Sequence, residues 1–237
     1  MGWSGTFHIG ETYAAYFGPS DDNTLHAHAA HQIVLATDHA AIIVDEQGRE
    51  WTGERFLIRP LVPHAVQCQG ALTLLYIDPQ CRLALDLMDH IGPDDICVLA
   101  EDTLPFNIDA DPAAIISSLK VYAAPQSPKL DPRLAEALND LGENPGSVSI
   151  AETARRCGIS DGRLRALARE QFGVPLSTWL IWRKLERAAI DLAAGAAPAD
   201  AALAGGFSDQ AHFSRTMRRM FGVTPKTALQ SLNRIDR

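Results

Sequence analysis

The C-terminal half of the chain contains one local pattern twice, and this repetition constrains the fold more than any other feature. The first copy covers 151–173 (AETARRCGISDGRLRALAREQFG) and the second covers 199–225 (ADAALAGGFSDQAHFSRTMRRMFGVTP). Each copy has a short segment with apolar residues at helical spacing, a turn with glycine, a serine, and a longer segment rich in arginine. The pattern predicts two helix-turn-helix units in an all-α region.

The first copy has the cap residues that such a unit needs. Ser149 and Glu152 have the spacing of a capping box, which opens a helix. Gly158 can adopt the left-handed conformation that ends this helix, and Ser160 can cap the next one. Helical spacing then predicts an inward face of Leu164, Leu167 and Ala168 and an outward face with Arg163, Arg165 and Arg169.

The second copy repeats these features with other residues. Pro198 suits the first turn of a helix, Gly205 and Gly206 end it, and Ser208 is expected to cap the next helix, which Gly222 closes. The expected buried positions are Phe207, Phe213, Met217 and Phe221, and the polar positions are Gln210, His212, Arg215, Arg218 and Arg219.

Between the two copies, 175–194 contains no internal glycine or proline and is predicted to form one helix. Twenty residues would span about 30 Å, which approaches the roughly 34 Å of one turn of DNA. Trp179, Trp182 and Leu185 would anchor this helix to both units. A helical core with a solvated charged face is the alternative for either copy alone, but two copies with the same turn favour DNA binding.

Residues 130–232 resemble the DNA-binding domain of the AraC/XylS family of bacterial transcription regulators, on the strings IAETARRCGIS, RLRALAREQFGVPLSTWLIWRKLERA and GFSDQAHFSRTMRRMFGVTP. The resemblance implies a seven-helix domain that binds asymmetric DNA sites through two recognition helices. It assigns DNA contacts to Gly162, Arg163, Arg165, Ala166 and Arg169 in the first helix and to Gln210, His212, Ser214 and Arg215 in the second. Gly162 and Ala166 are smaller than the residues that many members carry there.

The charges divide the chain at the same place. Residues 1–125 hold 5 Lys and Arg against 17 Asp and Glu, a net charge of −12, whereas 126–237 hold 16 against 12, a net charge of +4. Such asymmetry indicates a nucleic-acid partner for the basic part and another kind of ligand for the acidic part. We therefore expect a sensory domain over 1–125 and a DNA-binding domain over 126–237, with a proline-rich hinge over 124–132 (APQSPKLDP).

The acidic part has the pattern of an all-β fold with flanking helices. Five short strand-like runs, QIVLAT, AAIIVDE, RFLIRP, AVQCQ and LTLLYID, follow one another between Leu25 and Asp78. Helices are expected over 79–90 and 111–122. The second has an apolar stripe of Ile115, Ile116, Leu119 and Tyr122, which could contact a second copy of the chain or pack on its own domain.

Histidines in this part share an arrangement that suggests a pocket. His26 and His28 are two residues apart and Gln32 has the same parity, so in an extended chain all three point to one side. His64 follows Pro60 and Pro63 in a second hairpin. The strings HxHxxxQ and PxxPH resemble the two motifs of the cupin sensory domain that is common in this regulator family. The resemblance implies a cupin-like barrel over about 20–80 and places these histidines at imidazole positions, with Gln32 where metal-binding cupins carry a carboxylate.

Several alternatives remain open for this pocket. Three imidazoles and an amide oxygen suit Zn²⁺, Ni²⁺ or Fe²⁺, whereas without metal the same residues would line an organic-ligand pocket or hydrogen-bond locally. A metal-dependent cupin enzyme fused to a DNA-binding module is the competing function, against which the missing carboxylate argues. The expected function is a non-enzymatic transcription regulator whose effector, a small organic molecule or a metal ion, modulates binding to promoter DNA.

The remaining expectations concern partners and location. RNA polymerase and a second copy of the chain are candidate partners. The start MGWSGTFHIG lacks the regions of a secretory signal, no run is long enough to span a membrane, and Cys68, Cys81, Cys97 and Cys157 have no CxxC spacing. A cytoplasmic protein with reduced thiols is therefore expected.

Overall fold

The structure is a computed structural model that describes residues 5–20, 23–36, 38–90, 94–107, 109–124, 130–143, 145, 148–222 and 225. It separates into two compact units, 1–126 together with 215–237, and 127–214. Most of the predicted hinge over 124–132 lies outside the described residues. No helix in the described ranges is long and apolar enough to cross a membrane.

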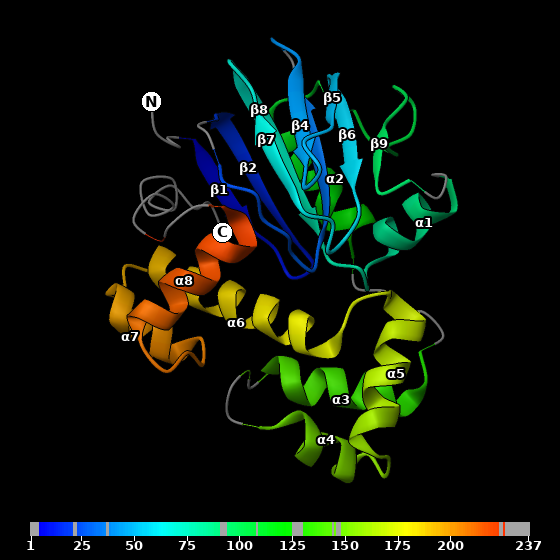
Figure 1. Cartoon of the computed structure of the whole chain (residues 1–237), viewed down its shortest axis with the longest axis vertical. Helices are drawn as coiled ribbons and strands as arrows, with labels where there is room; N and C mark the ends of the chain where they lie inside the picture. Colours follow the sequence, from blue (N-terminus) through cyan, green and yellow to red (C-terminus); the bar gives the residue numbers. More distant parts are fainter. Residues whose placement is uncertain are drawn as a thin grey trace. The chain divides into compact units, whose positions relative to one another are not determined.

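The N-terminal part is β-rich, as predicted, and its strands form two antiparallel sheets (Figure 1). The larger sheet has the order β1-β2-β8-β3-β6-β9. Its strands are β1 (Thr6–Ile9), β2 (Tyr13–Pro19), β8 (Ala71–Ile77), β3 (His31–Ala36), β6 (Arg55–Ile58) and β9 (Ile96–Val98). The smaller sheet has the order β5-β4-β7, with β5 (Glu50–Gly53), β4 (Ala41–Asp45) and β7 (His64–Gln67).

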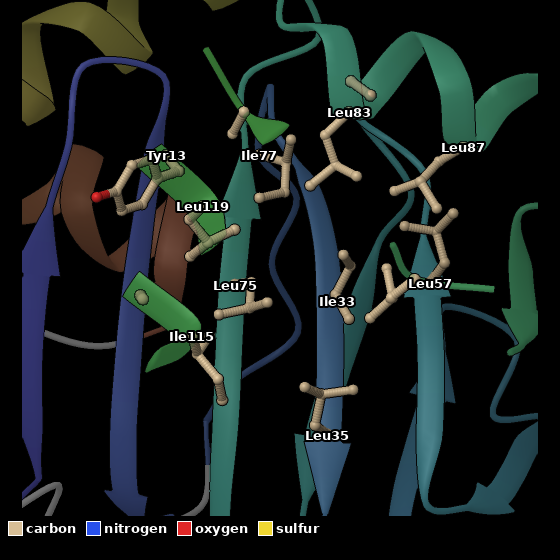
Figure 2. Close-up of a cluster of buried hydrophobic side chains, with 14 of the residues drawn as sticks. Tyr13, Ile33, Leu35, Leu57, Leu75, Ile77, Leu83, Leu87, Ile115 and Leu119 are labelled. Atoms are coloured by element: carbon tan, nitrogen blue, oxygen red, sulfur yellow. The ribbon is translucent and has the colours of Figure 1, made fainter. Parts of the chain in front are cut away.

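The expected cupin-like barrel is not closed. Ladders among the described residues stay within each sheet, and an isolated antiparallel bridge between His26 and His64 joins the segment before β3 to β7. Helices cover one face of the larger sheet (Figure 2). The sequence pattern identified β3, β4, β6, β7 and β8. It missed β1, β2, β5 and β9. In β2 the alanines and the final proline have low strand propensity.

Strand β3 shows how the larger sheet is buried on both faces. All six of its residues are buried, and because side chains alternate along a strand, Ile33 and Leu35 lie on one face while Gln32 and Val34 lie on the other. The first face belongs to the main hydrophobic core, with Leu57 of β6 and Leu75 of β8 (Figure 2). Gln32 is a polar residue on the second face and is fully buried.

Two helices complete that core. Helix α1 (Arg82–His90) contributes Leu83 and Leu87, and α2 (Pro112–Tyr122) contributes Ile115 and Leu119 (Figure 2). Asp111 caps α2 by accepting a hydrogen bond from the backbone of Ala114. Of the two predicted roles for the stripe on α2, packing on its own domain is therefore observed for Ile115 and Leu119, and full burial contributes roughly 1.5–3 kcal/mol for each such side chain.

The C-terminal part is all-α, as predicted. Its helices are α3 (Pro132–Glu143), α4 (Ile150–Arg156), α5 (Asp161–Phe172), α6 (Leu176–Ala193), α7 (Pro198–Ala204) and α8 (Gln210–Phe221). Helix α6 matches the predicted long helix within one residue at each end, and its Trp179, Trp182 and Leu185 are buried. The pairs α4–α5 and α7–α8 are the two predicted helix-turn-helix units.

Candidate DNA-binding and effector sites

The turn of the first helix-turn-helix unit is a Schellman motif. Gly158 has a φ of 69°, the backbone N–H of Gly158 donates to the carbonyl of Arg155, and that of Ile159 donates to the carbonyl of Ala154. Ser160 then caps α5 by accepting a hydrogen bond from the N–H of Arg163. The unit therefore ends one helix and starts the next within four residues, as the sequence predicted.

The second unit has the same turn. Gly206 has a φ of 80°, its N–H donates to the carbonyl of Leu203, and the N–H of Phe207 donates to the carbonyl of Ala202. Gly205 is required for a different reason, because an added Cβ would lie 2.7 Å from the carbonyl oxygen of Lys184 in α6. This glycine permits close packing of α7 on α6, and the next one supplies the left-handed turn.

The predicted cap of α8 was wrong by one residue. Asp209 accepts the N–H of His212 at 2.7 Å, and its carbonyl accepts the first helical hydrogen bond, from Phe213. Ser208 instead donates to the Asp209 carboxylate at 3.1 Å. A carboxylate at this position also interacts favourably with the helix dipole, which explains why it replaces the neighbouring serine as the cap.

Counting from the caps Ser160 and Asp209 gives α5 and α8 a common register. At four, seven and eight residues after the cap, both helices are buried. These positions are Leu164, Leu167 and Ala168 in α5 and Phe213, Thr216 and Met217 in α8. Phe221, which was predicted to be buried, is only half-buried, and Met220 is buried in its place. The matching register means that the two helices present equivalent outward positions.

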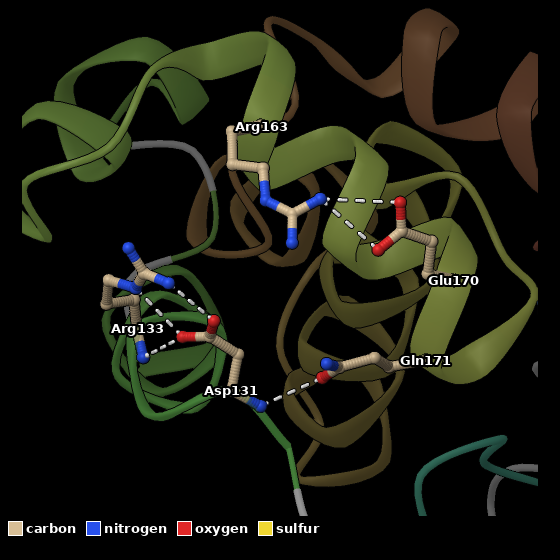
Figure 3. A network of polar contacts seen from close by, with 5 residues as sticks. All are labelled: Asp131, Arg133, Arg163, Glu170 and Gln171. Carbon is tan, nitrogen blue, oxygen red and sulfur yellow. Dashed lines mark hydrogen bonds and ion pairs between the residues drawn. The ribbon is translucent and has the colours of Figure 1, made fainter.

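The outward arginines of α5 are engaged in ion pairs. The guanidinium of Arg163 lies 3.3 Å from the carboxylate of Glu170, which is about two turns further along the helix (Figure 3). Arg165 donates to Asp161 at 3.0 Å. Both pairs are about half exposed and carry little stability by themselves. Arg169 is exposed and has no ion pair among the described residues. The predicted DNA contacts Gly162 and Ala166 lie exposed and half-buried, respectively.

A second ion pair lies close to Arg163. Asp131 receives two hydrogen bonds from the guanidinium of Arg133, and its own backbone N–H donates to Gln171 of α5 (Figure 3). The hydrogen bonds from Arg133 lower the pKa of Asp131 to about 2, with a smaller contribution from the charge of Arg163. The start of α3 is thereby attached to the end of α5.

The predicted DNA contacts of α8 are mostly exposed. Gln210, His212 and Arg215 are exposed, and Ser214 is half-buried with its hydroxyl donating to the carbonyl of Gln210 at 2.8 Å. The Nδ1 atom of His212 lies 3.2 Å from the Ser208 hydroxyl oxygen. Within the described residues, Arg215 has no ion pair, in contrast to the paired arginines of α5.

Two residues that the sequence analysis did not single out hold the units in place. Asp140 of α3 accepts hydrogen bonds from Thr153, at 2.9 Å, and Arg156, at 3.1 Å, both on α4. Lys184 of α6 donates to the carbonyl of Gly206 at 2.9 Å, and burial lowers the pKa of its ammonium group. Both contacts depend on residues far apart in the chain, so no local pattern could identify them.

In the β-rich part, the structure brings together all four predicted pocket residues. His26, His28 and His64 are buried, and their candidate ligand atoms lie within 4.8 Å of one another. The Gln32 Oε1 atom lies 2.8 Å from His28 Nε2 and 2.7 Å from His64 Nε2. His26 and His28 precede β3 instead of beginning it, because the bridge between His26 and His64 holds this segment apart from the larger sheet.

The three rings are neutral at physiological pH. Burial lowers the pKa of His26 to about 3, with a further contribution from His28. Burial also lowers the pKa of His28, and it lowers that of His64 well below the usual value, with help from the other two rings. A neutral imidazole has one nitrogen that donates and one with a free lone pair, which is the form that ligates metals.

The surroundings of the cluster add two features. The ring of Tyr76, from β8, lies edge-on to that of His28 with centroids 5.2 Å apart. Leu61 has a φ of 67°, which is unusual for a residue other than glycine, and its N–H donates to the carbonyl of His28 at 2.8 Å. Such strain at a turn that ties two histidine segments together indicates a constrained site. The group of converging ring nitrogens does not include His31, although that side chain is buried, or the exposed His39.

Comparison with known proteins identifies the C-terminal part. Residues 153–231 match a family model described as a helix-turn-helix domain. A transcriptional regulator with an AraC-type DNA-binding domain from Chromobacterium violaceum is 30% identical, covering 44% of this chain and 92% of that chain with a TM-score of 0.40. No curated protein gives a significant sequence match.

Two solved structures of ToxT from Vibrio cholerae match over most of this chain. One has a TM-score of 0.60 at 10% identity and covers 94% of this chain and 99% of that chain. Another, described as wild-type ToxT with a bound unsaturated fatty acid, has a TM-score of 0.57 at 13% identity and covers 94% and 97%. The order of a β-rich part followed by a helical part is therefore shared with a solved two-part protein.

Proposed function

Because the chain belongs to the AraC-type transcription regulators through its helix-turn-helix domain, we propose that α5 and α8 both bind promoter DNA and that an effector in the β-rich part modulates this binding. The observation that carries the proposal is the common register of the two recognition helices, each preceded by the same Schellman turn. Two helices built alike are both expected to contact DNA.

The geometry around these helices supports contact with DNA. The 18 residues of α6 span about 27 Å at roughly 1.5 Å per residue, comparable to one turn of DNA at about 34 Å. Arg215 on α8 could read guanine, and Gln210 could read adenine, through paired hydrogen bonds to base edges. The arginines of α5 are placed among small residues and suit phosphate contacts better.

The β-rich part is the proposed sensor. The buried cluster of His26, His28, Gln32 and His64 is a concentration of polar groups that a purely structural domain would not need. A fatty acid is bound in a ToxT structure of similar architecture, which supports a small-molecule effector as one possibility and leaves a metal ion as the other. Since the matched proteins are regulators, we assign this part to sensing and not to catalysis.

Two further expectations belong to the same proposal. A promoter-binding protein works where the chromosome is, so we place the chain in the cytoplasm. We also expect a second copy of the chain and RNA polymerase as partners, because a regulator acts on transcription through the polymerase. Size-exclusion chromatography with light scattering tests the first partner, and transcription from a selected promoter with purified polymerase tests the second.

The DNA proposal is tested by selecting ligands for the full chain from a randomised duplex pool. Fluorescence anisotropy then compares selected and scrambled duplexes at physiological salt. We expect affinities that differ by about 10³-fold or more. Arg215→Ala should reduce this ratio, whereas Arg187→Ala on the exposed side of α6 removes the same charge and serves as the control. Equal affinity for both duplexes would overturn the proposal.

The effector proposal uses the same assay with added ligand. Oleate represents the fatty acids and Ni²⁺ represents the divalent metals. A true effector should change the affinity for the selected duplex by roughly fivefold or more, because coupling energies between sites are typically about 1–3 kcal/mol. If neither ligand class changes the affinity, modulation through the β-rich part is wrong while DNA binding stands.

A further inference from the structure

A cavity lies between α2 and the turn that joins β1 to β2. Its volume is about 390 Å³, within the range of roughly 300–1,000 Å³ that is usual for small-molecule sites. Residues 8–13 line the strand side, and one face of α2 with the two residues that follow it lines the helix side. The lining contains no member of the buried histidine cluster, so this cavity is a separate site in the β-rich part.

The inner surface of the cavity is apolar, and Gly10 and Tyr13 give it its shape. The ring of Tyr13 is buried and belongs to the main core, beside Leu119 (Figure 2). A Cβ atom at Gly10 would lie 2.3 Å from Tyr13 Cε1, so the absence of a side chain leaves room for the ring. Ile9 and Ile116 line the cavity and are half-buried. An apolar group of a ligand therefore finds an apolar surface here.

Tyr13 also supplies a polar group to the cavity. Within the described part of the chain its hydroxyl has no hydrogen-bond partner, and it points away from the side chain of Leu119 (Figure 2). Burial raises the pKa of this hydroxyl above its usual value, so it stays protonated at physiological pH and can donate. A largely buried tyrosine usually has a partner for its hydroxyl. The free O–H of Tyr13 is therefore available to a ligand.

Two charged side chains line the cavity, and they differ in their availability. Glu11 is exposed at the turn and takes part in another interaction. Lys120 is exposed in the last turn of α2, and the described residues include no ion-pair partner for it. Because helical side chains lean toward the start of their helix, the Lys120 ammonium is expected near Ile116 and Ser117. The available charge beside the apolar surface is therefore positive.

From these observations we propose that the cavity binds a small carboxylate with an apolar body. The apolar body lies on Tyr13 and Ile116, and the carboxylate accepts hydrogen bonds from the Lys120 ammonium and the Tyr13 hydroxyl. Hydrogen bonds to an ionised group are stronger than those between neutral groups, so these donors select an acid over its neutral analogue. The proposal deepens the proposed function, since it names an effector class and a site for it, and it rests on that function only for the regulatory role.

The end of α2 connects the cavity to the hinge. The hydroxyl of Thr12, in the turn, donates a hydrogen bond to the carbonyl of Ala123, which follows α2. Ala123 and Ala124 line the cavity, and the predicted hinge begins at Ala124. A ligand in the cavity therefore contacts the segment from which the chain continues in sequence to α3. If the ligand fits only one arrangement of this segment, it shifts the protein toward that arrangement.

Ligand binding is measured on the full chain without DNA, so that its failure is distinct from a failure of the proposed function. Isothermal titration calorimetry compares 3-phenylpropanoate and octanoate with the neutral 3-phenylpropan-1-ol and the cationic 3-phenylpropan-1-amine. We expect one site per chain and an affinity for at least one acid that exceeds that for the alcohol by about tenfold. The preferred acid shows whether the apolar body is aromatic or a straight chain. Equal affinity for acid and alcohol, or a preference for the amine, would overturn the proposal.

Variants locate the bound acid. Lys120→Met removes the charge but keeps a long side chain that favours helix, so acid binding should fall about tenfold while alcohol binding is retained. Arg187→Met, on α6, removes the same charge outside the lining and should change neither. Ser117→Phe, at an exposed position of the lining, should fill the cavity and abolish binding of both ligands with an unchanged melting temperature. Acid binding that survives both Lys120→Met and Ser117→Phe, or no acid binding by the wild type, would overturn the proposal.

The regulatory role has a test of its own. A saturating concentration of the bound acid should change the affinity for the selected duplex by roughly fivefold or more in the wild type. The same acid should have no effect on duplex binding by Lys120→Met. An unchanged duplex affinity in the wild type would overturn the regulatory role, whereas the calorimetry alone decides whether the cavity binds a carboxylate.

Discussion

The two recognition helices share a backbone design but differ in the environment of their charges. In α5, Arg163 and Arg165 are paired with acidic residues on the same helix. In α8, Arg215 has no such pair among the described residues, and the helix has no acidic residue in its first turn. The contrast shows that two helices capped at the same position and with the same buried register can differ in their exposed charges, because different residues of the sequence determine each.

This difference suggests different roles in recognition. An arginine that is paired with a carboxylate must break this ion pair before it binds DNA, so its net contribution to DNA-binding affinity is smaller. An unpaired arginine loses only contacts with water. We therefore expect α8 to supply more of the sequence-specific affinity than α5.

The buried position four residues after each cap should be equally essential. Phe213→Ala should lower the free energy of unfolding by about 3–5 kcal/mol, and Leu164→Ala by about 2–5 kcal/mol, because each leaves a cavity in a closely packed core. Denaturant unfolding followed by circular dichroism measures both values. Arg218→Ala, on the exposed side of α8, is the control. A small effect at only one position would show that the two units are not equivalent in packing.

The outward positions should not be equivalent. Arg215→Ala should cost roughly 1–3 kcal/mol of binding to a selected duplex if it reads a base edge. Arg165→Ala should weaken binding to all duplexes more evenly and reduce the slope of affinity against salt concentration. Gln210→Ala should relax the base preference in one half of the site. Anisotropy titrations at several salt concentrations distinguish these outcomes, and an effect on sequence preference alone in all three variants would contradict the division.

The caps of the two recognition helices allow a smaller, matched comparison. Ser160→Ala and Asp209→Ala should each lower the free energy of unfolding by about 1 kcal/mol, because each leaves a backbone N–H at the helix start without its acceptor. Ser208→Ala should cost less, since that hydroxyl bonds to the cap and not to the helix. Thermal melting of the three variants ranks them. A larger loss for Ser208→Ala than for Asp209→Ala would restore the serine as the cap.

The smallest effect concerns the ion pair on α5. Asp161→Asn removes the partner of Arg165 and a negative charge near the proposed DNA surface, so affinity for any duplex should rise by about two- to fivefold at low salt. The gain should disappear in the Asp161→Asn, Arg165→Ala double variant, which a double-mutant cycle detects. An unchanged affinity in the single variant would mean that Arg165 is not released toward DNA.

Much of the C-terminal part follows from local chemistry. Gly158 and Gly206 specify left-handed turns, Ser160 caps its helix, and the apolar spacing assigns the buried face of α5, so the sequence alone predicted both units. The expected cap at Ser208 was wrong because Ser208 and Asp209 are both good caps, and local rules do not choose between two adjacent candidates. The contacts of Asp140 and Lys184 were not foreseen, since they join residues that are not neighbours in the chain.

In the β-rich part, less of the arrangement follows from local sequence. Parity in the sequence predicted that His26, His28 and Gln32 lie together, and they do, although a bend at 29–30 separates the two histidines from β3. Strand-like runs located five strands. The cupin resemblance had placed His64 with them, and the structure confirms that it joins the cluster. Only the tertiary structure decided that the sheets do not close into a barrel and that Gln32 directs its oxygen at two imidazoles. Parity is a property of one extended segment, whereas the approach of separate segments depends on which sheet each strand joins and on the helices that cover the larger sheet.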